Sequence, residues 1–334
     1  MEVILDFGVR FLSQLQSPTL AFLLGGILIA ALGSRLTIPD SIYKFIVFML
    51  LLKVGLKGGM AIGEADLGAM LLPALIAVAM GCLIVVIGRY TLAMLPGIRT
   101  EDGIATAGLF GAVSGSTLAA GTVVLEADGI SYEPWAVALY PFMDIPALVL
   151  AIVVASIHLK RKDGSGEKVQ IWPIIKESLQ GPALSALLLG IALGLFTNPE
   201  QVFESFYEPL FRGLLSVLML IMGIEAYARL NELRRVAHWF AVYAAVMPIV
   251  HGLIAFGLGW IAHELTGFSP GGVVLLAVIA GSSSDISGPP TLRAGIPTAN
   301  PSAYIGSSTS LGTPVAIAIG IPLYIGLAQV VFGI

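Results

Sequence analysis

Long apolar stretches with almost no charge are the feature of this sequence that most restricts its fold. Several run for roughly 18 residues or more, the length that an α-helix needs to cross a bilayer. Of the 334 residues, 57% are hydrophobic and 11% are charged, whereas an average soluble domain has about 25% charged residues. We therefore expect an all-α integral membrane protein. The same composition argues against a soluble enzyme, a nucleic-acid-binding protein or a disulfide-linked secreted domain.

Glycine, proline and charged residues divide the chain into ten apolar segments, each predicted to be a transmembrane helix. The segments are 18–33, 39–56, 67–95, 103–126, 134–158, 181–197, 207–228, 237–264, 270–294 and 302–332. We expect the first 17 residues to be an amphipathic segment rather than a cleavable signal peptide. A hydrophilic stretch from Lys160 to Lys168 follows the fifth segment and has the composition of a flexible linker.

Proline, glycine and serine residues recur at matching positions in the two halves of the chain. An offset of 164 residues pairs Pro18 with Pro182, and an offset of 168 pairs Gly55 with Gly223, Ser114 with Ser282, Ser116 with Ser284 and Pro146 with Pro314. We interpret 1–158 and 181–334 as two repeats joined by a cytoplasmic linker at 159–180. Five spans per repeat force the two halves into opposite orientations, and inverted repeats are typical of transporters.

Lysine and arginine residues gather in the connections that follow the odd-numbered segments. The positive-inside rule places these connections in the cytoplasm and both termini outside it. The residues are Arg35, Arg99, the Lys160–Lys168 cluster, Lys176, Arg229, Arg234, Arg235 and Arg293.

The fourth and ninth segments carry small polar residues and glycines at mid-span, which predicts a break in each helix. Backbone groups freed at that depth must line a protein cavity. The N-terminal end of a half-helix suits an anion, so we expect a small-anion site at Ser114, Gly115, Ser116, Thr117, Ser282, Ser283 and Ser284. Alternatively, each serine could pack within a helix with its hydroxyl bonded to a carbonyl.

Two aspartates inside apolar segments are candidates for a cation site, because intramembrane carboxylates are costly. Asp144 lies between two prolines in the fifth segment, and Asp285 lies in the ninth. Alternatively, Asp285 could cap the following half-helix and Asp144 could pair with Lys53 or Lys57. We expect Na⁺, or a proton, at a site whose oxygen ligands come from Asp144, Asp285, Ser116, Ser284, Asn300 and Thr309, the last of these in the run Ser307–Ser310.

Catalytic motifs are missing where their residues can be checked. The sequence lacks a Gly-x-Ser-x-Gly motif at either predicted break, a zinc-protease motif around His263 and a Walker-type loop. We expect no enzyme and no organic cofactor, and transport that is passive or driven by an ion gradient.

Three motifs, at 108–117, 138–148 and 282–296, closely resemble the cyanobacterial sodium-dependent bicarbonate transporter family. The stretches 180–185 and 300–305 are also similar to it, so the resemblance covers essentially the whole chain. The central linker is shorter than in some relatives.

The resemblance implies a Na⁺/HCO₃⁻ symporter of the inner (plasma) membrane that serves a CO₂-concentrating mechanism. It implies a homotrimer in which a core domain (spans 3–5 and 8–10) moves as an elevator against a gate domain (spans 1–2 and 6–7). It also implies inhibition by a PII-like, adenine-nucleotide-binding regulator on the cytoplasmic face. Bicarbonate would lie between the two breaks, with Na⁺ beside it at Asp144.

Rival functions are a Na⁺/H⁺ antiporter or a Na⁺-coupled symporter of another small anion, such as a bile-acid-like symporter, with the same architecture. A passive channel and an intramembrane hydrolase that uses a serine of a break are further alternatives.

Overall fold

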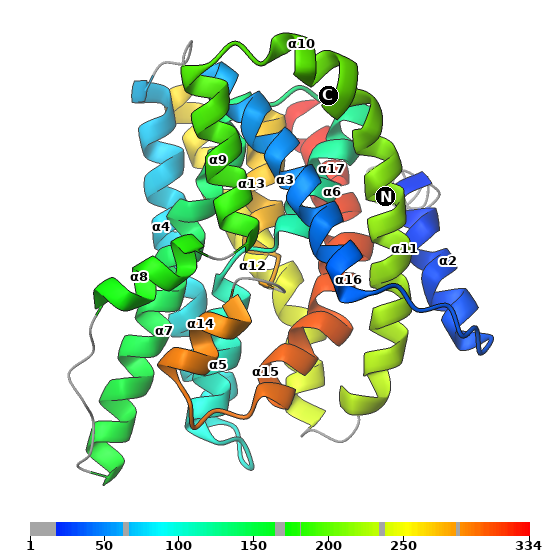
Figure 1. The fold of residues 1–334 in the computed structure, drawn as a ribbon. Coiled ribbons are helices and arrows are strands. Elements are labelled where there is room, and N and C mark those ends of the chain that lie inside the picture. Colours follow the sequence, from blue (N-terminus) through cyan, green and yellow to red (C-terminus); the bar gives the residue numbers. More distant parts are fainter. Residues whose placement is uncertain (1–17, 63–66, 164–170, 181, 234–237, 285–287) are drawn as a thin grey trace.

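The computed structural model describes residues 18–62, 67–163, 171–180, 182–233, 238–284 and 288–334, and all regular secondary structure within these ranges is helical (Figure 1). The longer helices of the first half are α2 (Pro18–Ala31), α3 (Asp40–Ile62), α4 (Leu67–Tyr90), α5 (Thr100–Gly111), α6 (Gly115–Ala127) and α7 (Leu139–Asp163). Those that follow are α8 (Ile171–Gln180), α9 (Pro182–Phe196), α11 (Glu208–Leu233), α12 (His238–Thr266), α13 (Pro270–Ala280), α14 (Gly288–Gly295), α15 (Pro301–Ser307) and α17 (Ile321–Phe332).

Short helical turns complete the chain between these elements. They are η1 (Leu92–Met94), η2 (Pro134–Ala138), α10 (Glu200–Val202), η3 (Phe203–Tyr207), η4 (Ser308–Gly312), α16 (Thr313–Val315) and η5 (Ala316–Gly320). The turns η3, η4 and η5 are π-helical.

Each of the ten predicted apolar segments contains helix, and in the described ranges six helical runs are long and apolar enough to cross a membrane. These six are Gly68–Met94, Thr100–Ala127, Pro134–Leu159, Glu200–Glu225, His238–Thr266 and Pro301–Phe332. Three shorter apolar helices, Ala21–Ala31, Ser185–Phe196 and Pro270–Ala280, lie in the first, sixth and ninth segments. This architecture fits a multi-pass, all-α membrane protein.

The predicted cytoplasmic linker 159–180 is helical at both of its ends. The helix α7 continues to Asp163, and α8 occupies Ile171–Gln180, so 164–170 alone in the predicted linker 159–180 falls outside the described residues. Pro173 lies in the first turn of α8, where its missing N–H has no helical partner to lose.

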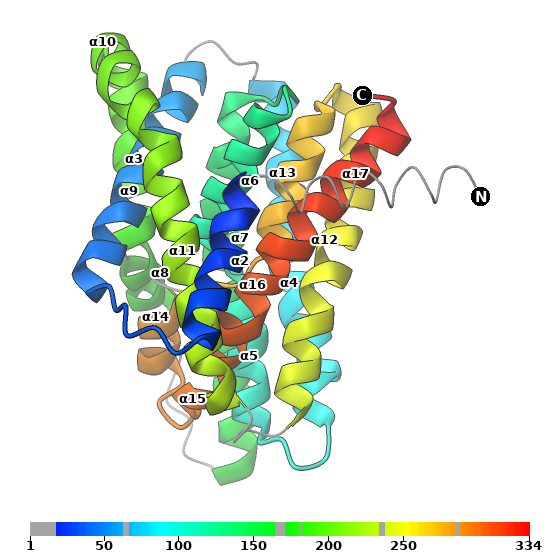
Figure 2. The same ribbon diagram turned by 90° about the vertical axis from the view of Figure 1, so that its right-hand side faces the viewer.

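The long helices run side by side, with their connections at two opposite ends of the molecule (Figures 1 and 2). The connections 91–99 and 296–300 lie toward the lower end in Figure 1, and 197–199 and the C-terminus lie at the upper end. The lower connection 91–99 contains Arg99, which belongs to the predicted cytoplasmic side.

Glycines allow two pairs of helices to pack with their backbones in contact. The most extensive contacts in the molecule join α3 to α9 and α2 to α11. A Cβ on Gly55 of α3 would meet the backbone of α9 at Leu187 and Gly190, and a Cβ on Gly26 of α2 would meet the backbone of α11 at Gly223. Small residues at such crossings are typical of helix packing in membranes.

The run that contains α5 and α6 is buried from Glu101 to Leu125, and its most apolar window is entirely buried. The helices α4 and α7 make the most extensive contacts with α5, and α14 and α15 also pack against it. An interruption in this run is therefore shielded from lipid, as backbone groups at membrane depth require.

Candidate functional site

The fourth predicted segment is interrupted at Ala112–Ser114, which we call the first break. The helix α5 ends at Gly111, and Ala112 and Ser114 have extended backbone conformations before α6 begins at Gly115. Glycines on both sides disfavour a continuous helix, and serine is a preferred N-cap. The Oγ of Ser114 accepts a hydrogen bond from the N–H of Thr117 at 3.2 Å, which fixes the start of α6.

The ninth predicted segment is interrupted between α13 and α14. Its described part, Gly281–Ser284, is called the second break. The helix α13 ends at Ala280, and the N–H of Gly288 at the start of α14 donates to the Oγ of Ser284 at 2.8 Å. Asp285 lies outside the described residues, so its predicted roles as a Na⁺ ligand or a helix cap stay predictions.

The two breaks are in direct contact at the centre of the protein. The N–H of Ser114 donates to the Oγ of Ser282 at 3.0 Å, across 168 residues of sequence. The N–H of Ser284 in turn donates to the carbonyl of Leu109 in α5 at 2.9 Å. All of these serines are at most 1% exposed. The hydrogen bonds hold two segments that are far apart in sequence at one buried point.

Further hydroxyl groups lie at or next to the two breaks. The Oγ atoms of Ser114 and Ser116 are 2.8 Å apart, and the Oγ of Ser283 lies 2.8 Å from that of Ser308 in η4. Two further hydroxyls, those of Thr117 and Ser310, are buried and have no hydrogen-bond partner in the described part of the chain. Buried polar groups without a partner are rare in proteins, so both hydroxyls are available to a small polar ligand.

Asp144 brings a carboxylate to the first break from α7. Its side chain is fully buried, and its Oδ1 accepts a hydrogen bond from the N–H of Val113 at 2.9 Å. Its Oδ2 is buried without a partner among the described residues. A buried carboxylate with one open oxygen is costly unless a cation or proton compensates it, which makes this oxygen a candidate ligand for a cation.

The alternative in which Asp144 pairs with Lys53 or Lys57 is wrong. The Nζ of Lys53 lies 3.0 Å from a carboxylate oxygen of Glu208 in α11, and that of Lys57 bonds to Glu126 at the end of α6. Both lysines are thus engaged by glutamates.

Asn300 is not brought to the breaks. Its side chain caps α15 by accepting a hydrogen bond from the N–H of Ser302 at 3.1 Å, and its own N–H donates to Asp102 at 2.7 Å. Asn300 is exposed, at the end of the molecule where α15 lies in Figure 1.

Thr309 lies in η4 but bonds within its own helix, because its hydroxyl donates to the carbonyl of Ile305 at 2.8 Å. Its neighbours on either side, Ser308 and Ser310, are buried instead. Thr313 was missed from sequence, yet its Oγ1 lies 3.4 Å from the Oγ of Ser283. The adjacent Pro314 could have indicated an irregular helix at this position. Proline has no N–H to bond the carbonyl of Ser310, and a π-helical turn precedes Pro314.

A second polar cluster lies where α3, α6 and α11 meet. Lys53 is 2% exposed and lies over the ring of Phe211, 4.0 Å from its centroid. The Nζ of Lys53 is 3.8 Å from Glu126, which also accepts a hydrogen bond from the hydroxyl of Tyr132 at 3.0 Å. Burial, reinforced by the Glu126 carboxylate, raises the pKa of the Tyr132 phenol, so it stays protonated and donates.

Comparison with known proteins finds one family model, described as the Na⁺-dependent bicarbonate transporter superfamily, that matches residues 18–329. A search of curated proteins finds no match. The matched region covers α2 through most of α17, so it includes both breaks and Asp144.

Proposed function

Because the chain belongs to the Na⁺-dependent bicarbonate transporter superfamily, we propose that it is a Na⁺/HCO₃⁻ symporter that imports both ions, and not an enzyme. The observation that carries this proposal is the contact between the two breaks, through the hydrogen bond from the N–H of Ser114 to the Oγ of Ser282. This contact brings together a helix N-terminus, several hydroxyls and one open carboxylate oxygen within a buried region. These are the groups needed to bind an anion and a cation together.

Bicarbonate would bind at the start of α6, between the two breaks. The positive end of the dipole of this 13-residue helix favours an anion at Ser114, Gly115, Ser116 and Thr117. The unpartnered hydroxyl of Thr117 would donate to its oxygens. From the other break, bicarbonate would be contacted by Ser282, Ser283 and Ser284.

Na⁺ would bind at the open oxygen of Asp144. Hard cations prefer oxygen ligands, and the remaining ligands would come from Ser116, Ser284, Thr309 and Asp285, whereas we leave out Asn300 because of its exposed position. The two ions would be bound side by side. Na⁺ would then lower the electrostatic cost of burying bicarbonate, and bicarbonate would lower the cost of burying Na⁺. This mutual stabilisation is the proposed basis of coupling.

Two repeats of opposite orientation, 1–158 and 181–334, would build this site, in ten membrane spans. The proposal is supported by the glycine crossings, because the offsets of 164 and 168 residues relate Gly26 to Gly190 and Gly55 to Gly223. The contact between Gly26 and Gly223 therefore corresponds to the contact between Gly190 and Gly55. A pseudo-twofold axis in the membrane plane would produce such a pair of contacts.

We further propose that α2, α3, α9 and α11 form the gate domain and that the other spans form a core domain that moves as an elevator. The extensive contacts among these four helices support a rigid gate. The family resemblance supports a homotrimer in the inner (plasma) membrane of a cyanobacterium, with both termini outside the cytoplasm. It also supports a role in a CO₂-concentrating mechanism and a PII-like regulator on the cytoplasmic face.

Labelled bicarbonate uptake into proteoliposomes that contain the purified protein tests this function. Uptake should require an inward Na⁺ gradient and stop when an ionophore collapses it. Flux without Na⁺ would point to a passive channel. Proton movement driven by Na⁺ without bicarbonate would point to an antiporter, and Na⁺-driven uptake of another anion in place of bicarbonate would point to a different symporter.

A further inference from the structure

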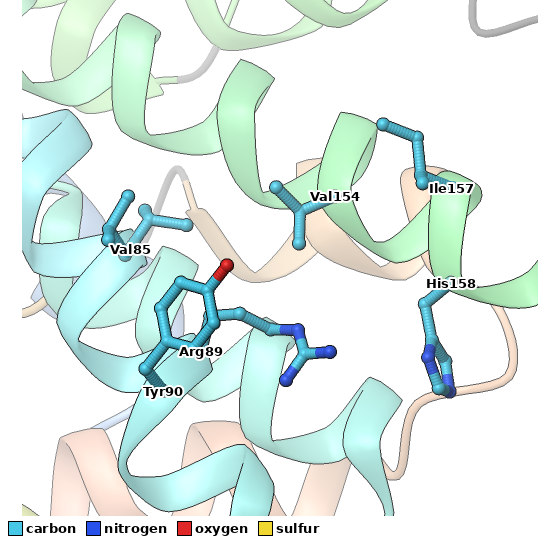
Figure 3. Close-up of a pocket in the computed structure, with 7 residues that line it drawn as sticks. Val85, Arg89, Tyr90, Val154, Ile157 and His158 are labelled. Carbon is cyan, nitrogen blue, oxygen red and sulfur yellow. The ribbon is translucent and has the colours of Figure 1, made fainter.

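A cavity of about 230 Å³ lies between α4 and α7. Figure 3 shows the guanidinium of Arg89 extending into the space between the two helices, on the side where His158 lies. The cavity is lined by Val85, Val86, Arg89, Tyr90, Val154, Ile157 and His158. It is too large for a single water, which occupies about 30 Å³, and too small for a whole lipid, so its size suits a headgroup.

The cationic and polar side chains of this cavity are available to a ligand. Within the described residues, neither Arg89 nor His158 has an ion pair or a side-chain hydrogen bond. Arg89 lies over the ring of Tyr90, 5.6 Å from its centroid. A guanidinium offers a planar fork of donors that matches two oxygens of a phosphate, and the imidazole of His158 adds a ring N–H.

The rim of the cavity is exposed on the outside of the helix bundle, and most of it is apolar. Val86 is 41% exposed, Ile157 47% and Tyr90 68%. Along α4 the exposed Leu71, Leu75 and Leu83 lie on the same side of the helix as Val86 and lead toward Arg89. In a membrane protein such a stripe faces acyl chains, and a tyrosine beside a basic residue is typical of the interface with water.

The cavity lies at the end of the molecule that is rich in lysine and arginine. Arg89 is in the last turn of α4, next to the connection 91–99, and Lys160, Arg161 and Lys162 follow His158 in the sequence. Anionic lipids are concentrated in the cytoplasmic leaflet and are attracted by basic residues at its surface.

We propose that this cavity binds the phosphate headgroup of an anionic phospholipid, with the acyl chains along the apolar stripe of α4. The inference does not depend on the transported ion. Free phosphate has the same charge chemistry but no acyl chains to occupy the stripe, so the lipid is the source to which the proposal commits.

Native mass spectrometry of the detergent-purified protein tests this proposal with phosphatidylglycerol, phosphatidylcholine and inorganic phosphate as probes. The variants are Arg89→Gln, Arg89→Gln/His158→Gln and the matched control Arg212→Gln, which removes an exposed arginine from α11. The wild-type protein and the control should prefer phosphatidylglycerol over phosphatidylcholine. Arg89→Gln should weaken phosphatidylglycerol binding by about fivefold, the effect of one basic residue near a membrane surface, and the double variant should lose the preference.

Other results would overturn the proposal. Equal binding of the two lipids by the wild-type protein would mean an uncharged apolar groove. Retention of inorganic phosphate to the same extent as phosphatidylglycerol would mean a soluble-anion site. A double variant that still prefers phosphatidylglycerol while its thermal unfolding matches that of the wild type would place the lipid elsewhere. If Arg89→Gln fails to fold, Arg89→Lys serves instead, because it keeps the charge without the planar fork of donors.

Discussion

The carboxylate of Asp144 accepts a hydrogen bond from the N–H of Val113 at 2.9 Å, so a residue of α7 holds the backbone of the first break. The other oxygen of the same carboxylate is buried and has no partner among the described residues. One oxygen therefore has a structural role while the second is open to a ligand. This division allows the two roles to be separated by mutation.

Asp144→Asn should reduce Na⁺-dependent bicarbonate uptake by at least about tenfold, while the protein stays folded. Asparagine keeps a carbonyl oxygen that can accept from Val113 but carries no charge to attract Na⁺. Uptake at increasing Na⁺ concentrations measures the effect. The control Asp40→Asn, whose side chain is 68% exposed and pairs with Lys44 on the same helix, should leave uptake unchanged. Undiminished Na⁺ stimulation of Asp144→Asn would remove this residue from the site.

Ser282→Ala should lower the free energy of unfolding and raise the KM for bicarbonate. Without the hydroxyl the N–H of Ser114 loses the acceptor that Ser282 provides, a loss of about 0.5–1.5 kcal/mol for one hydrogen bond. Thermal unfolding and uptake kinetics measure the two effects. Ser205→Ala removes an exposed hydroxyl that bonds within its own helix and should change neither. A Ser282→Ala protein with wild-type kinetics would argue against a substrate site between the breaks.

Gly26→Ala should destabilise the protein, whereas Gly25→Ala should not. A Cβ at position 26 would collide with the backbone of α11 at Leu220, and one at position 25 would meet open space. Overpacking costs about 1–3 kcal/mol, and replacing glycine by alanine at an open helical position stabilises by up to about 1 kcal/mol. Unfolding of the two variants in detergent measures the difference. Equal stabilities would contradict the close crossing of α2 and α11.

Lys53 and Glu208 should show a coupling energy of about 1–2 kcal/mol in a double-mutant cycle of unfolding. Lys53 is buried, so its attraction to Glu208 is screened less than at a surface, although Glu208 itself is 47% exposed. The pair Lys44 and Asp40, both exposed, serves as the matched cycle and should give less than about 0.5 kcal/mol. Equal couplings would mean that burial of Lys53 does not strengthen its ion pair.

The positions of the helices follow from hydrophobicity, because apolar runs between charged or breaking residues can satisfy their backbone in lipid only as helices. The first break was predictable for a similar reason. Its Gly111 and Gly115 weaken the helix, and Ser114 is a good cap for the next one.

The composition of the cation site was harder to predict from sequence. Thr309 and its neighbours Ser308 and Ser310 all carry a hydroxyl group, so the sequence does not distinguish them as ligands. The rotation of the helix about its axis decides which of these side chains lies toward the breaks. The π-helical turn at Ser308–Gly312 shifts that phase. Asn300 has a suitable oxygen for a cation, yet its side chain caps the start of α15. Its position before Pro301 and Ser302 is typical of an N-cap and could have indicated this role.

The central claim is that bicarbonate and Na⁺ bind next to each other at the meeting point of the two breaks. Calorimetric titration of the purified protein with bicarbonate, at zero and at saturating Na⁺, tests it most directly. The account predicts that Na⁺ tightens bicarbonate binding, that bicarbonate tightens Na⁺ binding by the same factor, and that Asp144→Asn abolishes both effects. Bicarbonate affinity that does not change with Na⁺ in the wild-type protein would contradict it.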